Sequence, residues 1–296
     1  MYGLSEKALG ALCALGSAAA WAIISLQVRR LSPIVSAFTI NAVRSSVAGV
    51  LLVAWILVER GVGGLTAMSA VTFWLLVASI MVGSAFGDTV FFEASRRIGL
   101  ARAMTISTTY PLIAAVLAAA LLGEWVSARV ALGSGLSLVG LAIIVSGRPD
   151  QVFEPLARWR GFVAAGLASV SWAASVVLIR IPLHEVDALT AQAVRLPAAG
   201  VLMFMTPWAR RGMIGIRVGG PGLAFQMLVI GVLTVASSVL FVAGLKHAGV
   251  AISTVLSSTA PMFAIPLGAV FLGERLAPRT VVGAVITVAG LAVLEL

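Results

Sequence analysis

The stretch YPLIAAVLAAALLGEWVS at residues 110–127 recurs in outline as APMFAIPLGAVFLGERLA at residues 260–277. Each copy places a proline before an apolar run that ends in Leu-Gly-Glu. The copies lie 150 positions apart in a chain of 296 residues, so each half of the chain carries one. A repeat at this spacing predicts that the protein is built from two homologous units.

The same correspondence extends over most of the sequence. Trp21 matches Trp172, and NAVR at residues 41–44 matches QAVR at residues 192–195, both at an offset of 151. Later landmarks recur at an offset of 150, namely Gly99 and Gly249, Pro111 and Pro261, Glu124 and Glu274, and Gly140 and Gly290. We therefore divide the chain into a first unit at 1–147 and a second unit at 148–296.

The composition is that of a membrane protein. Hydrophobic residues make up 60% of the chain and charged residues only 10%, with a mean hydropathy of +1.10. A soluble protein carries about 25% charged residues, so this chain cannot build a water-soluble surface. The excess of 20 Lys and Arg over 11 Asp and Glu fits phospholipid headgroups better than nucleic acid. The single cysteine, Cys13, and two distant histidines predict no disulfide, metal or cofactor.

Apolar runs of about 20 residues, long enough to cross a bilayer core of about 30 Å, divide the chain into membrane spans. The sequence predicts ten such helices, at 7–28, 34–57, 70–94, 100–122, 127–146, 160–181, 186–208, 222–245, 250–272 and 277–295. We expect an all-α polytopic fold in the lipid bilayer, without a separate soluble domain.

Each unit then contains five helices, and five is an odd number. The second unit must enter the membrane from the opposite side, which makes the units inverted-topology repeats. Such repeats are typical of secondary transporters, in which exchange of conformation between the halves opens a central site to alternate sides. The chain has no nucleotide-binding P-loop, so a gradient or downhill flow must supply the energy.

The repeated unit resembles the EamA module of the drug/metabolite transporter superfamily. The resemblance rests on the tryptophan in the first helix, the arginine in the second, the basic residue closing the third (Arg96, Lys246) and the proline-to-Leu-Gly-Glu fourth helix, all present twice. It implies an exporter of amino acids, especially aromatic ones, or of related small metabolites in the bacterial inner membrane. Drugs, nucleosides or sugars are alternative substrates on the same scaffold.

Other function classes fit the sequence less well. A membrane-embedded enzyme would need converging His, Asp, Glu or Cys residues, and the deep carboxylates are Asp88 and Glu93 alone. We therefore expect no enzyme activity. A channel remains an alternative, which saturable counterflow would separate from a carrier. We expect a monomer, and the dimer suggested by the small residues of GSAFG at 83–87 is the alternative.

Asp88 lies in the middle of the predicted third helix, where a carboxylate costs about 2.5–3.5 kcal/mol unless it faces protein or water. It is a candidate for binding a substrate ammonium group or for coupling transport to protons. The alternative is a structural partner for Arg44. Its repeat mate, Ser238, is a further candidate for the cavity lining, and either role of Asp88 breaks the symmetry of the units.

Three aromatic residues are candidates for the lining of a central cavity. Trp21 and Trp172 are repeat mates well inside their helices, and packing against alanines is the alternative. We favour Trp172, because the exporters that the chain resembles carry an aromatic residue there. Tyr110, whose mate is Ala260, is the candidate for substrate stacking.

Hydroxyl groups surround the proline of each fourth helix. Proline frees a backbone carbonyl, and these hydroxyls are candidates for binding a zwitterion or, alternatively, for bonding back to their own helix. The residues are Ser107, Thr109, Ser257 and Thr259. Arg44 and Arg195 are expected to be structural charges, and Glu93 is expected to pair with Arg96 and Arg97.

The orientation in the membrane stays open. An even number of helices places both termini on one side. That side carries five lysines and arginines and the opposite side thirteen, with Arg44 and Arg195 left out. The positive-inside rule therefore places both termini outside the cell, whereas the family resemblance implies that they are cytoplasmic.

Overall fold

The fold is that of a computed structural model, which describes residues 6–31, 33–98, 103, 106–107, 109–123, 127–145, 155–260, 262–263, 267 and 278–295. These residues form helices and short turns, and none of them lies in a strand. The first unit contains α1 (Glu6–Leu31), α2 (Ala37–Arg60), α3 (Gly63–Thr66), α4 (Ala70–Ile80), the π-helix η1 (Met81–Asp88), α5 (Thr89–Ile98), α7 (Tyr110–Leu122) and α8 (Ala128–Val145). The second contains α9 (Pro155–Arg180), the 3₁₀-helix η2 (Pro182–His184), α10 (Ala188–Phe204), α11 (Pro207–Val218), α12 (Gly220–Ser257) and α14 (Pro278–Glu295).

The long helices have the length and hydropathy of membrane spans. Five stretches of the described residues meet both criteria, at Glu6–Val28, Ala37–Arg60, Ala70–Ile98, Trp159–His184 and Gly220–Ser257. The pair α10 and α11 adds a sixth if it is taken as one bent span. These helices confirm an all-α polytopic fold. They do not complete the expected count of ten, because the predicted spans 100–122 and 250–272 are described only in part.

The boundary predicted between the spans 222–245 and 250–272 lies inside α12, where Gly249 breaks the helix with φ of 80° and ψ of 174°, a conformation that favours glycine. Another boundary differs from the sequence prediction. The segment after the span at 186–208 was expected to be a loop and forms α11 instead. Pro207 occupies the first turn of α11, where a missing backbone N–H costs nothing, and the chain bends there by 91°.

Side-chain caps explain where several helices begin. Ser36 accepts a hydrogen bond from the backbone N–H of Thr39 at the start of α2. Asp187, its repeat mate, accepts from the N–H groups of Leu189 and Thr190 at the start of α10. Each cap satisfies donors that the first turn of a helix leaves free. The two units therefore start their second helices by the same device.

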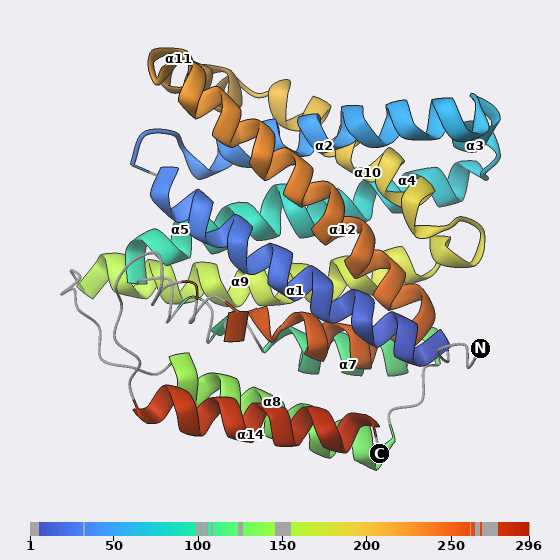
Figure 1. The fold of residues 1–296 in the computed structure, drawn as a ribbon, viewed down its shortest axis with the longest axis vertical. Helices are drawn as coiled ribbons and strands as arrows, with labels where there is room; N and C mark the ends of the chain where they lie inside the picture. Colours follow the sequence, from blue (N-terminus) through green and yellow to red (C-terminus); the bar gives the residue numbers. More distant parts are fainter. Residues whose placement is uncertain are drawn as a thin grey trace.

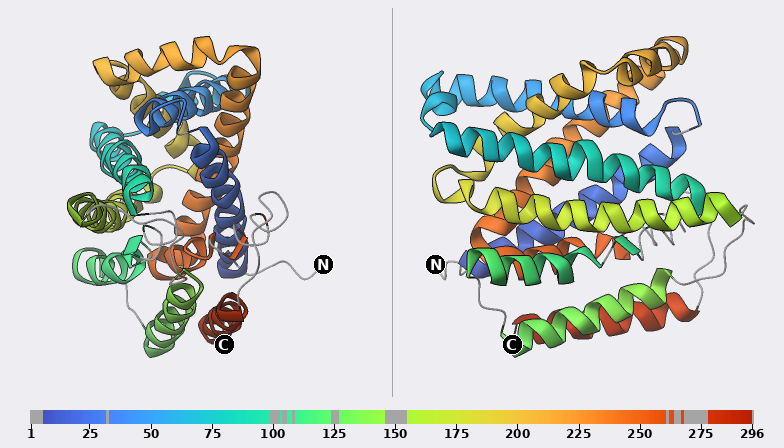
Figure 2. Two further views of the ribbon diagram at one scale, coloured as in Figure 1. Left: turned by 90° about the vertical axis from the view of Figure 1, so that its left-hand side faces the viewer. Right: turned by 180° about the vertical axis from the view of Figure 1, so that it is seen from behind.

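Helices of the two units pack against one another in pairs. α1 runs along α12, α2 along α10 and α8 along α14, while α9 lies against α4, η1 and α5 (Figure 1). The pair α8 and α14 stands beside the rest of the bundle, and α11 lies across the neighbouring helices (Figure 2). The start of α1 and the end of α14 lie at the same end of the bundle (Figure 1).

Small residues permit the closest of these pairs. A Cβ added at Gly140 would lie 2.5 Å from the backbone nitrogen of Thr287, and one at Gly290 would lie 2.5 Å from that of Ser137. Gly140 and Gly290 are repeat mates, so the contact between α8 and α14 is itself nearly symmetrical. Backbones can approach this closely in a membrane only where side chains are absent.

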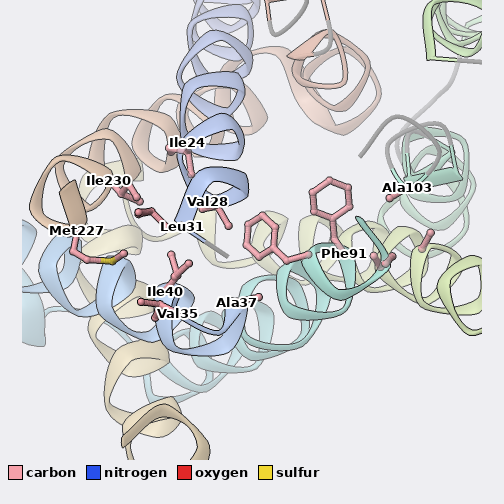
Figure 3. Packing of buried hydrophobic residues seen from close by; sticks show 14 of the residues in the cluster. Ile24, Val28, Leu31, Val35, Ala37, Ile40, Phe91, Ala103, Met227 and Ile230 are labelled. Carbon is pink, nitrogen blue, oxygen red and sulfur yellow. The ribbon is translucent and has the colours of Figure 1, made fainter. Parts of the chain in front are cut away.

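A large apolar cluster fills the end of the bundle where α1 ends and α2 begins. Ile24 and Val28 of α1 pack with Ile40 of α2, Ile230 of α12 and Phe91 of α5, all nearly inaccessible (Figure 3). Further buried residues of α9 and α11 join this cluster. This cluster packs helices of both units against one another at this end of the bundle.

The opposite end is held by polar contacts between the units. Asp187 at the start of α10 pairs with Arg60 at the end of α2. Glu185 accepts hydrogen bonds from the backbone N–H and hydroxyl of Ser69 and from the hydroxyl of Thr72, all at the start of α4. The segment at 181–187 of the second unit is therefore tied to two helices of the first.

Glu185 is expected to make part of the stability pH-dependent. Its hydrogen bonds from Thr72 and then Ser69 lower the pKa of this carboxyl group below its ordinary value. A lowered folded-state pKa stabilises the fold above the unfolded pKa of about 4.3, and this stabilisation is lost as the pH falls through the folded value. Thermal unfolding in detergent should therefore show a smaller drop between pH 7 and pH 3 for Glu185→Gln than for the wild type. An equal drop in both proteins would contradict this origin.

Candidate functional site

A cavity of about 200 Å³ lies between the two units. Helices α1, α2, α4, η1, α5 and α7 of the first unit and α9, α10 and α12 of the second contribute to its wall. Among the residues proposed from sequence as cavity-lining, those in the wall are Trp21, Asp88, Ser107, Tyr110, Trp172, Ser238 and Ser257. Arg44 and Arg195, expected to be structural, also line it.

Thr109 and Thr259 do not belong to this wall. The hydroxyl of Thr109 donates to the carbonyl of Ile106 and contacts the hydroxyl of Ser169, both at 2.8 Å. The hydroxyl of Thr259 donates to the carbonyl of Leu256 at 2.6 Å. Both therefore bond to nearby groups, as the alternative interpretation of the fourth-helix hydroxyls supposed. Glu124, Pro261 and Glu274 lie outside the described residues.

An ion pair between Arg44 and Asp88 occupies one side of the cavity. The guanidinium Nη2 of Arg44 meets Asp88 Oδ2, and its Nε donates to Asn41 Oδ1 at 2.9 Å. The hydroxyl of Ser84 donates to the same Asp88 oxygen at 2.7 Å and accepts from Arg44 at 3.1 Å. Both charges are nearly inaccessible, and this network supplies the hydrogen bonds that a buried pair requires.

The two repeat-mate tryptophans flank this ion pair. The indole Nε1 of Trp172 donates to Asp88 Oδ1 at 2.8 Å. The guanidinium carbon of Arg44 lies 5.4 Å from the centre of the Trp21 ring, within the range of a cation–π interaction. The position of Asp88 is therefore compatible with both roles considered from the sequence. It faces the cavity, where it could contact a substrate or exchange a proton, and it also pairs with Arg44.

The π-helical segment η1 places Asp88. The sequence predicted a continuous helix here, but the turns from Met81 to Asp88 are widened. Such bulges occur often at functional sites. Gly83 and Gly87 of this segment face α9, and a Cβ at Gly87 would lie 2.9 Å from the indole of Trp172. The small residues of GSAFG thus serve close packing inside one chain, where they let Trp172 reach Asp88.

An aromatic wall extends from Trp172. Tyr110 packs edge-on against the Trp172 ring with 5.8 Å between ring centres, and Phe91 lies 5.1 Å away on a tilted plane. The hydroxyl of Tyr110 donates to the carbonyl of Thr254 in α12 at 3.0 Å, which fixes the ring across the boundary between the units. A flat apolar group in the cavity would meet ring faces or edges at this wall.

Arg195 lies in the second unit where Arg44 lies in the first, but its partners differ. Its Nε donates to Ser79 Oγ at 3.0 Å and its Nη1 to Gln192 Oε1 at 3.0 Å. Its Nη2 reaches Ser175 Oγ at 3.4 Å. Among the described residues, no carboxylate pairs with Arg195, although only 5% of the residue is exposed.

Several lining residues escaped the sequence analysis. Ser84 precedes Asp88 by four residues, and Gln192 precedes Arg195 by three. Helical spacing from the buried charges would have identified both. Ser258, one of the hydroxyl residues that the sequence places around the proline of the second fourth helix, also lines the cavity. The remaining missed polar residues have no such signal in the sequence; they are Ser17, Ser175, Thr234 and Ser237.

Glu93 lies apart from this cavity. Its carboxylate pairs with Arg96 at 3.1 Å and Arg97 at 2.7 Å, and all three side chains are at least one-third exposed. The spacing of three and four residues along α5 places them on one face, as expected from the sequence. Such an exposed pair contributes little to stability.

Comparison with known proteins identifies the architecture built around this cavity. The sequence matches the EamA-like transporter family over residues 8–146 and again over residues 159–296. The chain belongs to this family. It is therefore a multi-pass membrane transporter whose two units are two EamA repeats. The family places it among transporters.

Individual relatives agree with this assignment. An uncharacterized transporter of Archaeoglobus fulgidus is 28% identical over 273 residues, which cover 92% of each chain. A crystal structure with 19% sequence identity superimposes with a TM-score of 0.76 and covers 96% of this chain and 95% of the other. At that identity the second similarity supports the fold alone.

Proposed function

We propose that this EamA protein is a secondary transporter that exports amino acids or related small metabolites by alternating access of the central cavity. The observation that carries the proposal is the cavity itself, which both repeats line and which combines buried charges, hydroxyl groups and an aromatic wall. A few placed polar groups in a largely apolar pocket are typical of small-molecule sites.

The size of the cavity favours small metabolites over drugs. Its volume of about 200 Å³ falls below the roughly 300–1,000 Å³ usual for pockets that hold drug-sized ligands. Trp172 and Tyr110 provide an apolar surface for a side chain, while Asp88 and Arg195 provide both signs of charge for a zwitterion. We place the protein in the bacterial inner membrane with both termini on one side.

Transport into liposomes tests this function. Purified protein would be reconstituted, and uptake of labelled amino acids measured in counterflow, with and without a pH gradient. Saturable counterflow is expected, because an alternating-access carrier exchanges substrate across the membrane, whereas a channel shows none. Uptake that needs the gradient would make Asp88 the proton-coupling group. Uptake without it would make Asp88 a binding or structural residue. Absence of counterflow for every amino acid would contradict the proposed substrate class.

A further inference from the structure

Arg195 carries a buried positive charge that forms no ion pair with any carboxylate of the described residues. Guanidinium has five N–H donors. Three of them point to the neutral oxygens of Ser79, Gln192 and Ser175, which leaves two without a described partner. The side chain lines the cavity, so these donors lie beside the space that a ligand would fill.

Comparison with Arg44 shows that a buried arginine without a carboxylate partner is specific to the second repeat among the described residues. Arg44 is held by Asp88, which lies on η1 of the same repeat. The repeat mate of Asp88 is Ser238, whose hydroxyl donates to the carbonyl of Val235 at 3.2 Å. Gln192 bridges Arg195 to the backbone carbonyl of Ser238, as its repeat mate Asn41 bridges Arg44 to that of Ser84. The two arginines therefore differ in the carboxylate of Asp88, which pairs with Arg44 alone among the described residues.

The charged residues of the cavity wall therefore carry a net formal charge of +1, from Arg44, Arg195 and Asp88. Burying an uncompensated charge away from water is costly, and inside a membrane the cost is met by pairing or by a water-filled cavity. An anionic ligand would compensate the charge only while it is bound. The resting cavity thus has an electrostatic preference for one sign of substrate.

We propose that Arg195 is the site at which this transporter binds a carboxylate group of its substrate. The inference rests on the proposed carrier function and narrows it to carboxylate-bearing metabolites, as opposed to sugars, nucleosides and amines. The fork of N–H donors on arginine matches a carboxylate geometrically, which a lysine ammonium does not.

Neighbouring groups place the rest of such a ligand. Ser175, a hydrogen-bond partner of Arg195, lies three residues after Trp172 on α9, so both face the cavity from one side of the helix. A carboxylate at Arg195 would then leave its side chain near the indole of Trp172. The carboxylate of Asp88 already accepts from Arg44, Ser84 and Trp172, which reduces its attraction for a ligand ammonium group.

Arg195 has unused hydrogen-bond donors, whereas Asp88 is already bound by protein groups, so analogues that lack one charged group should bind differently. Removing the carboxylate from a ligand should weaken binding more than removing the ammonium group. The probes are phenylalanine, its carboxamide and 3-phenylpropionate, together with acid and amide pairs of a small and a branched amino acid. Competition against counterflow and ligand-induced thermal stabilisation of the full-length protein are the two readouts.

We expect each amide to bind at least about tenfold more weakly than its acid, the range that hydrogen bonds to a charged group supply. Arg195→Gln should weaken the acids by a similar factor and leave the amides unchanged, and Arg195→Lys should restore part of the loss. Arg96→Gln is the matched control, because the side chain of Arg96 is 55% exposed on α5.

A second variant keeps the test decisive if Arg195→Gln does not fold. Ser238→Asp adds an internal carboxylate at the repeat mate of Asp88 and should weaken the acids by competing for Arg195. Equal binding of acid and amide to the wild type, or unchanged binding of acids to Ser238→Asp and Arg195→Gln, would overturn the proposal. Saturable counterflow of a sugar, nucleoside or amine without that of acids would overturn it while leaving the carrier function intact. No counterflow of any probe would overturn both.

Discussion

Asp88→Asn is expected to abolish transport and to lower the stability of the protein by about 3–5 kcal/mol, the cost of removing one partner from a buried ion pair. The substitution leaves the Arg44 guanidinium without a counter-charge in a position where 3% of the residue is exposed. Asparagine keeps the size of the side chain, so the loss comes from charge rather than from a cavity. Chemical denaturation in detergent and counterflow in liposomes measure the two effects.

The double variant Asp88→Asn, Arg44→Gln separates the two roles of Asp88. Removing both charges ends the burial of an unpaired arginine, so most of the lost stability should return. If Asp88 acts on substrate or protons, the double variant folds and stays inactive. If Asp88 only neutralises Arg44, transport returns together with stability. Failure of the second substitution to restore any stability would contradict the coupling of the two residues.

Trp172→Ala is expected to reduce stability by about 3–5 kcal/mol and to abolish detectable transport, because a large ring is removed from a packed position. The ring contacts Phe91, Tyr110 and Gly87, and its N–H binds Asp88. Trp172→Phe keeps most of the apolar surface and loses the hydrogen bond. It should therefore fold nearly as well as the wild type and show a clear loss of transport.

A matched substitution outside the cavity controls for general effects of losing an indole. Trp208 is 68% exposed at the start of α11, so Trp208→Phe should leave both transport and stability nearly unchanged. Equal effects of Trp172→Phe and Trp208→Phe on counterflow would show that the bond from Trp172 to Asp88 does not matter for function. Equal stability of Trp172→Ala and the wild type would contradict the packing described for this ring.

The repeat and the composition were sufficient to predict the architecture. Apolar runs long enough to cross a bilayer follow from local composition, because lipid requires the backbone to satisfy its own hydrogen bonds within helices. The correspondence of Trp21 with Trp172 and of Arg44 with Arg195 then showed that the chain folds as two copies of one unit. Gly249, already identified as a landmark of the repeat, is the residue at which α12 breaks.

The candidate site was predictable only in part, since a sequence shows which residues are polar and deep but not which of them meet. Asp88, Trp172 and Tyr110 were recognised as individual residues. In the sequence, the hydroxyl groups of Thr109 and Thr259 were equivalent to those of Ser107 and Ser257. Only the direction in which each side chain points in the folded protein decides which of them face the cavity.

The sequence by itself determined that this protein is a two-repeat membrane protein, because hydropathy and internal homology are written along the chain. The tertiary structure alone decided how the charges are shared. Asp88 forms an ion pair with Arg44, and the π-helical segment allows Trp172 to donate a hydrogen bond to Asp88. Arg195 forms hydrogen bonds only with neutral groups among the described residues. These pairings depend on helix rotations and close approaches between segments far apart in the chain, which no local pattern specifies.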